Sequence, residues 1–144
     1  MAKKKGNIKN TERRVRFGSY ATEEDIIFCM QTMAAKGLPP IPQEYANFIK
    51  SSNGHVRRGV IFYGTNQGEV LDMGNDLVSQ NENFAKYHKN LKHCVLLGCV
   101  DMDNFLYNTE TACYQIVERG YSTPEQEYDT FAEMFADVKK KYKR

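Results

Sequence analysis

The first part of the chain carries apolar residues at helical spacing. Thr22 is followed by three acidic residues, which is typical of a helix N-terminus, where the helix dipole favours negative charge. Apolar side chains then recur on one helical face: Ile26, Ile27, Met30, Met33 and Ala34. Gly37 predicts the end of this helix because glycine readily adopts the left-handed conformation found just past helix ends.

A second, shorter helix is predicted from Pro42, because the fixed φ of proline suits the first helical position. The side chains on its buried face are Tyr45, Phe48 and Ile49. Asn53-Gly54 marks its end. The sequence therefore predicts a helical hairpin joined by the proline-rich turn at 39–42.

The middle of the chain contains strand-like runs. Residues 60–63 are β-branched and aromatic and lie between two glycines, which predicts a short strand. Residues 65–75 are rich in glycine and asparagine and indicate a loop, after which Asn75 or Asp76 is expected to cap a short helix. The run 94–100 is continuously apolar, as expected of a central strand buried on both faces.

Two further strands are expected at 105–107 and 112–118, after turns at 101–104 and 108–111. Turns this short leave no room for a parallel crossover, so the three strands from 94 to 118 are predicted to form an antiparallel meander.

The final element is predicted to be an amphipathic helix. Thr130 and Glu133 have the spacing of a capping box. Its apolar stripe consists of Phe131, Met134, Phe135, Val138 and Tyr142. The fold class expected from these patterns is α+β, with a mixed, mainly antiparallel sheet of about four to six strands and helices packed on it. Residues 1–21 are expected to be a flexible basic arm, and 22–144 a single domain.

Charge is strongly segregated along the 144 residues. Residues 1–16 carry seven bases and one acid, and residues 139–144 carry five bases and no acid. The remaining residues, 17–138, hold eight bases and seventeen acids, a net charge of −9. The body of the protein is thus acidic, while both ends are basic.

Basic ends suggest nucleic acid, because clustered Lys and Arg displace counterions from phosphates. Short lysine-rich termini are more often solvated tails, and an acidic body opposes docking on a phosphate backbone. Direct nucleic-acid binding is therefore not the favoured interpretation, although binding through the two basic ends remains an alternative hypothesis. The acidic body favours a protein partner with a basic surface.

No motif in the chain encodes a reaction, so an enzyme is not expected. The four cysteines, Cys29, Cys94, Cys99 and Cys113, lack the paired spacing of a zinc site, and the last three are interpreted as small core residues. Asp101 and Asp103 form a D-x-D, but such acids also serve turns, so we expect no metal and no cofactor. The chain lacks an apolar run of about 20 residues and a secretory signal pattern at its N-terminus, which predicts a cytoplasmic protein without a membrane-spanning helix.

The acidic residues have two interpretations. The first is a solvated surface; the second is a cluster on one face that, with tyrosine anchors, binds a cationic partner. The candidate partner-binding residues under the second interpretation are Glu69, Asp72, Asp76, Asp101, Asp103, Tyr107 and Glu110.

The order of these features resembles that of a known superfamily. The segment 38–54, with its Leu-Pro, Tyr45, Phe48 and Asn53-Gly54, is similar to the LP-x-x-Y-x-x-F-L-x-x-x-N-G segment of the SUKH superfamily. The glycine-flanked strand 58–64 and the late Thr130–Met134 segment also resemble its YrhA-like branch, and the likeness covers about residues 22–138.

The SUKH superfamily includes fungal cell-wall-synthesis regulators and many bacterial immunity proteins. The resemblance implies a non-enzymatic, cytoplasmic domain that binds and neutralises a cognate polymorphic toxin, such as a nuclease, through its acidic surface. The alternative is a SUKH-like scaffold or regulatory module that binds another protein.

Overall fold

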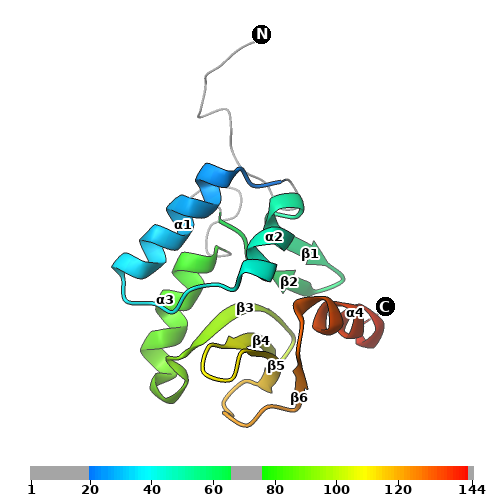
Figure 1. The fold of residues 1–144 in the computed structure, drawn as a ribbon. Coiled ribbons are helices and arrows are strands. Elements are labelled where there is room, and N and C mark those ends of the chain that lie inside the picture. The colour runs from blue at the N-terminus through cyan, green and yellow to red at the C-terminus, as the bar shows by residue number, and fades with distance from the viewer. Residues whose placement is uncertain (1–19, 66–75, 143–144) are drawn as a thin grey trace.

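The computed structural model describes residues 20–65 and 76–142 and has an α+β fold, with helices packed on an antiparallel sheet (Figure 1). The helices are α1 (Glu23–Ala35), α2 (Gln43–Ser51), α3 (Leu77–Tyr87), the short 3₁₀ helix η2 (Lys89–Leu91) and α4 (Phe131–Lys141). The strands are β1 (His55–Arg57), β2 (Val60–Phe62), β3 (Cys94–Val100), β4 (Asp103–Asn108), β5 (Cys113–Glu118) and β6 (Gln126–Tyr128). No helix among the described residues is both long and apolar enough to cross a bilayer.

The six strands lie in the sheet in chain order, and each pairs antiparallel with the next. The predicted meander is confirmed as β3–β4–β5. The edge strands β1 and β6 were not predicted, because each has three residues and is too short to show an alternating pattern. Strand β4 begins at Asp103, which was expected in the preceding turn; it pairs there with Val100 and Glu118.

Strand β3 is the central strand, and all its residues except Cys99 are buried. A Cβ on Gly98 would lie 2.0 Å from the carbonyl oxygen of Ile61, so glycine is what allows β2 to approach this closely. Closer to the start of β3, where β2 no longer pairs with it, the side chain of Asn81 in α3 forms hydrogen bonds to the β3 backbone. Its Nδ2 donates to the Leu96 carbonyl at 2.9 Å, and its Oδ1 accepts from the Leu96 N–H at 2.7 Å.

Helices α1 and α4 begin where the sequence predicts, each at a capping box. The Thr22 hydroxyl accepts from the Asp25 N–H at 3.1 Å, and the Asp25 carboxylate accepts from the Thr22 N–H at 3.0 Å. Gly37 has a φ of +74°, in the left-handed region expected at the end of α1. Pro42 occupies the N-cap of α2 rather than its first helical position, since its ψ of 154° is still extended.

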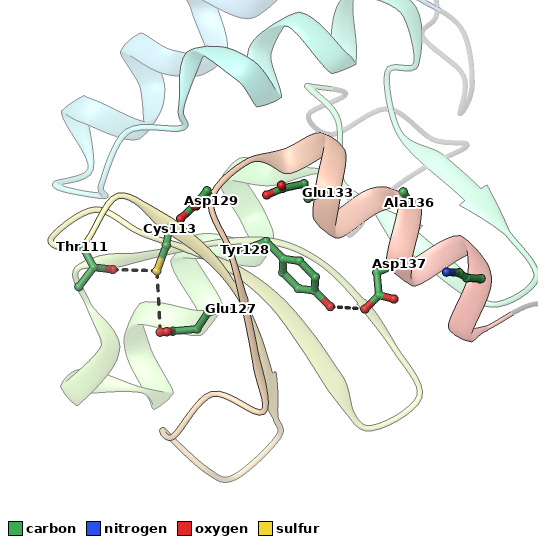
Figure 2. Close-up of a pocket in the computed structure, with 9 residues that line it drawn as sticks. Thr111, Cys113, Glu127, Tyr128, Asp129, Glu133, Ala136 and Asp137 are labelled. Atoms are coloured by element: carbon green, nitrogen blue, oxygen red, sulfur yellow. Dashed lines mark hydrogen bonds between the residues drawn. The ribbon is translucent and has the colours of Figure 1, made fainter.

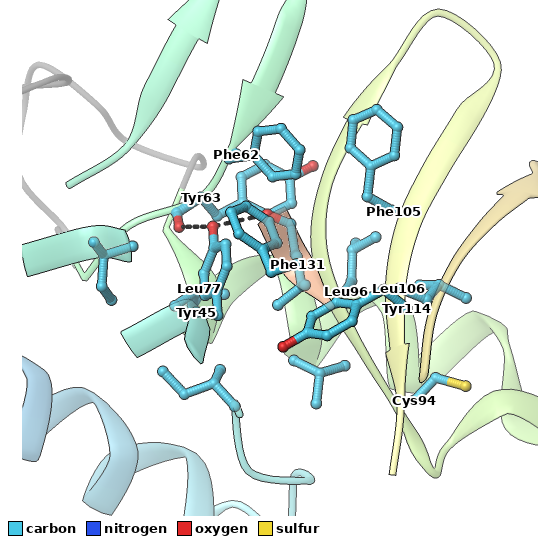
Figure 3. Close-up of a cluster of buried hydrophobic side chains, with 14 of the residues drawn as sticks. Tyr45, Phe62, Tyr63, Leu77, Cys94, Leu96, Phe105, Leu106, Tyr114 and Phe131 are labelled. Atoms are coloured by element: carbon cyan, nitrogen blue, oxygen red, sulfur yellow. Dashed lines mark hydrogen bonds between the residues drawn. The ribbon is translucent and has the colours of Figure 1, made fainter. Parts of the chain in front are cut away.

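An aromatic cluster joins α2 and α4 to the sheet (Figure 3). Tyr45 is fully buried, and its ring centroid lies 5.2 Å from that of Phe131. The ring of Phe62 stacks on that of Phe105 at 4.9 Å. The Tyr45 hydroxyl lies 2.5 Å from the carbonyl oxygen of Tyr63 and 3.1 Å from that of Leu97, so the buried polar group is satisfied.

The ordered domain begins earlier than expected. Ala21 was assigned to the flexible arm, but it is buried, and its N–H donates to the Ile49 carbonyl at 3.3 Å. Ala21 therefore belongs to the core beside α2. Residues 1–19 of the expected arm and residues 66–75 of the expected loop lie outside the described residues.

Candidate functional site

The structure separates the seven residues that the sequence suggested as a partner-binding surface. Glu69 and Asp72 lie outside the described residues. Asp76 is fully buried at the N-cap of α3, where its Oδ2 accepts from the Ser79 N–H at 2.9 Å. Asp76 is therefore not part of a binding surface, because it caps α3 inside the molecule.

The remaining acidic candidates lie at opposite ends of β4. Asp101 and Asp103 are at the β3–β4 turn, whereas Glu110 is in the turn between β4 and β5. At about 3.4 Å per residue, the six residues of β4 hold these turns roughly 17 Å apart. They therefore do not form one continuous acidic patch.

Several of these candidates have intramolecular partners. The Asp103 carboxylate accepts a hydrogen bond from the Tyr142 hydroxyl. The Glu110 carboxylate lies 3.8 Å from Nε2 of His93. Tyr107 is half-buried, with its ring centroid 4.8 Å from that of the buried Tyr114. These contacts give the side chains roles within the fold.

A different set of acids gathers in an open groove beside α4, which we call the acidic groove (Figure 2). Its volume is about 790 Å³. Four carboxylates and one lysine line it. The lining residues are Thr111, Cys113, Glu127, Tyr128, Asp129, Glu133, Ala136, Asp137 and Lys140.

Local structure sets the positions of these four carboxylates. Glu127 lies in β6, and Asp129 lies in the bend that directly follows this strand. Glu133 and Asp137 are one helical turn apart on α4. Because Thr130 turns the chain directly from β6 into α4, the strand pair and the helix pair face one groove.

Three of the carboxylates are positioned by hydrogen bonds. Glu127 accepts from the Gln115 side-chain amide at 2.7 Å. Asp137 accepts from the Tyr128 hydroxyl at 2.5 Å, and Figure 2 shows this tyrosine pointing at Asp137. Burial, followed by the hydrogen bond to Asp137, raises the pKa of Tyr128, so the hydroxyl stays protonated as a donor. Glu133 accepts from the Thr130 N–H at 3.3 Å.

These four residues were not predicted as a group, although their spacing in the sequence was a signal for it. Four acids fall within 127–137, spaced by two along a strand and by four along a helix. Recognising them required β6, whose three residues carry no strand pattern of their own. Glu133 had been interpreted through its capping role alone, which the structure confirms.

The cysteines and potential metal ligands add little chemistry to this surface. Among the described residues, no three His, Cys, Asp or Glu side chains lie close enough to hold a metal ion. Burial raises the pKa of the Cys29 thiol to about 12 and that of Cys94 to about 11, so both are protonated at neutral pH. Cys99 and Cys113, which were expected in the core, are half-exposed.

The acidic groove is suited to binding a cationic surface. Three of its four carboxylates are held by hydrogen bonds, so these three lose little side-chain entropy when a partner binds. The groove is open, so its acids keep part of their hydration while they attract Lys or Arg from a partner. Comparison with known proteins identifies no relative: no family model matches the sequence, and no curated protein matches it significantly.

Proposed function

We propose that this protein is a non-enzymatic, immunity-type protein that binds a cognate toxin with a basic surface and blocks it. The resemblance of segment 38–54 to the SUKH superfamily supports the immunity role. The net charge of −9 over residues 17–138 supports a cationic partner.

The observation that carries the proposal is the acidic groove. Among its lining residues, four carboxylates face a single lysine, so a basic partner meets a surface of opposite charge. A nuclease toxin suits this groove because its substrate-binding surface must itself attract phosphates. Occupation of that surface by Glu127, Asp129, Glu133 and Asp137 would exclude its substrate.

The proposal is tested with the toxin-domain protein encoded beside this gene. Co-expression is expected to restore growth of cells that produce the toxin, and calorimetry is expected to show a direct complex. Glu127→Gln with Asp129→Asn removes two charges at nearly constant shape and is expected to weaken binding at least tenfold, because charged pairs in interfaces are each worth about 1 kcal/mol or more.

A matched variant removes two charges elsewhere. Glu24→Gln with Glu82→Gln changes exposed acids of α1 and α3, outside the groove, and is expected to leave affinity within about twofold. Equal loss in both double variants would show that net charge, not the groove, attracts the toxin. If the toxin does not bind and growth is not restored, the immunity role is wrong and the scaffold alternative replaces it.

A further inference from the structure

A second groove, of opposite charge, also lies beside α4 and shares Ala136 and Lys140 with the acidic groove. We call it the basic groove. Its volume is about 580 Å³, and it lies between the C-terminal half of α4 and the β1–β2 hairpin, which are neighbours in Figure 1. Its lining residues are His55, Arg57, Arg58, Val60, Phe135, Ala136, Val138, Lys139, Lys140 and Tyr142.

The cations of this groove come from segments far apart in the sequence. Arg57 and Arg58 belong to the β1–β2 hairpin, whereas Lys139 and Lys140 belong to the last turns of α4. None of the described residues that line the groove is acidic. The sequence placed Lys139 and Lys140 in a solvated basic end; in the structure they are exposed residues of α4 that form one wall of this groove.

Contacts across the groove fix this arrangement. The rings of His55 and Phe135 meet edge to face, with centroids 5.3 Å apart, and so hold β1 against α4. The Lys139 ammonium lies over the Phe135 ring at 4.7 Å. After burial, Arg57 and Lys139 are the main causes that lower the pKa of His55, which shows that positive charge converges on this point.

We propose that the basic groove binds the phosphodiester backbone of a single-stranded nucleic acid. Arg57, Arg58, Lys139 and Lys140 would contact phosphates from both walls. Apolar and aromatic side chains at the base of the groove, including Val60, Phe135 and Tyr142, would pack against sugars and bases.

The mixture of charged walls and an apolar base favours nucleic acid over an acidic peptide. An extended peptide places a polar N–H and C=O at every residue, and these lose free energy when they lie on apolar side chains without partners. The faces of bases carry no hydrogen-bonding groups and can pack there without losing one. Guanidinium groups also bind phosphate oxygens in a bidentate manner, which suits the two arginines.

The test measures binding of the full-length protein to fluorescein-labelled single-stranded DNA and RNA by fluorescence anisotropy over a range of salt. Four phosphate contacts on a single strand predict a slope of about −2.8 for log K against log salt concentration. Lys139→Gln with Lys140→Gln is expected to reduce the slope to about −1.4 and to weaken binding at least tenfold at low salt. Arg57→Gln, on the opposite wall, is expected to reduce the slope to about −2.1.

The control variant, Lys86→Gln with Lys89→Gln, removes two exposed cations of α3 and η2 and is expected to leave the slope unchanged. Deletion of residues 1–16 separates the groove from the basic N-terminus and is expected to preserve the effect of both groove variants. Circular dichroism tests whether each variant is folded. If Lys139→Gln with Lys140→Gln does not fold, Arg57→Gln tests the groove independently.

Three results would overturn the inference: no binding at low salt, equal weakening by the control variant, or competition by polyglutamate as strong as that by unlabelled oligonucleotide. Binding that vanishes with residues 1–16 would also overturn it, because the arm would then be the site. Glu127→Gln with Asp129→Asn is expected not to weaken oligonucleotide binding, so failure of this inference and failure of toxin binding are separate outcomes.

Discussion

His55 is a residue whose environment the sequence did not reveal. It lies at the start of β1, with the aromatic rings of Phe48, Phe62 and Phe135 around it. Burial and two nearby cations, Arg57 and Lys139, lower its pKa from the ordinary value of 6.5. The neutral imidazole is therefore the form that the folded protein favours.

This shift predicts a pH dependence of stability. Because the folded state binds the His55 proton more weakly than the unfolded state, the stabilising contribution is present above pH 6.5 and is lost as the pH falls through the lower folded value. The free energy of unfolding can be measured with urea at about pH 7.5 and about pH 5. Between these two values it is expected to fall more for the wild type than for His55→Gln.

His88→Gln is the matched comparison, since His88 is also half-buried but stacks on Phe84 at the C-terminal end of α3. This variant is expected to lose as much stability at low pH as the wild type. If the wild type loses no more stability at low pH than His55→Gln does, the pH dependence does not come from His55.

At the scale of elements, Glu44 joins two helices that are distant in sequence. It lies in the first turn of α2, and its two carboxylate oxygens accept from the N–H groups of Phe131 and Ala132 at 2.8 and 3.0 Å. These N–H groups begin α4 and have no partner within the helix. A negative charge at this end also complements the helix dipole.

Glu44→Gln is expected to lower the free energy of unfolding by about 1–2 kcal/mol, because hydrogen bonds to a charged group are worth more than neutral ones and the amide offers one acceptor oxygen. Chemical denaturation measures this change. Glu82→Gln, which removes an exposed ion pair with Lys36, is expected to cost less than about 0.5 kcal/mol. Equal effects of the two substitutions would show that Glu44 does not connect α2 to α4.

At the scale of the whole molecule, stability is concentrated in the middle of the sheet. Strands β3, β4 and β5 pair along most of their lengths, whereas β1 and β6 pair at three positions each. The core residues with no exposed surface include Val95, Leu97, Phe105, Leu106 and Ile116, all on the three central strands. Each such side chain contributes about 1.5–3 kcal/mol through burial.

Hydrogen exchange is therefore expected to be slowest in β3, β4 and β5, where amides open only in global unfolding. The amides of β1 and β6 are expected to exchange faster through local opening, and native-state exchange followed by NMR measures both. Edge amides as slow as those of the centre would contradict this order. The acidic groove lies beside β6 and the basic groove beside β1. Local opening of these edge strands would let both grooves adjust to a partner.

Much of the fold follows from local sequence patterns. The N-cap at Thr22, the capping box at Thr130, Gly37 at the end of α1 and the continuous apolar run of β3 all act within a few residues, and the structure confirms them. Short strands were harder to predict, because three residues give no periodicity. The burial of Asp76 was not predictable either, since a cap and a surface acid have the same local sequence.

The sequence by itself determined the longer elements, the α+β class and the excess of acids in the body, because these depend on hydrogen bonds between near neighbours and on composition. The tertiary structure decided which charges face one another. Glu127 and Asp137 line one groove because β6 leads into α4, and Arg57 and Lys139 line another because β1 packs against that helix. The packing of β1 on α4 depends on ring contacts between residues that are 80 positions apart in the chain, His55 and Phe135, which no local pattern encodes.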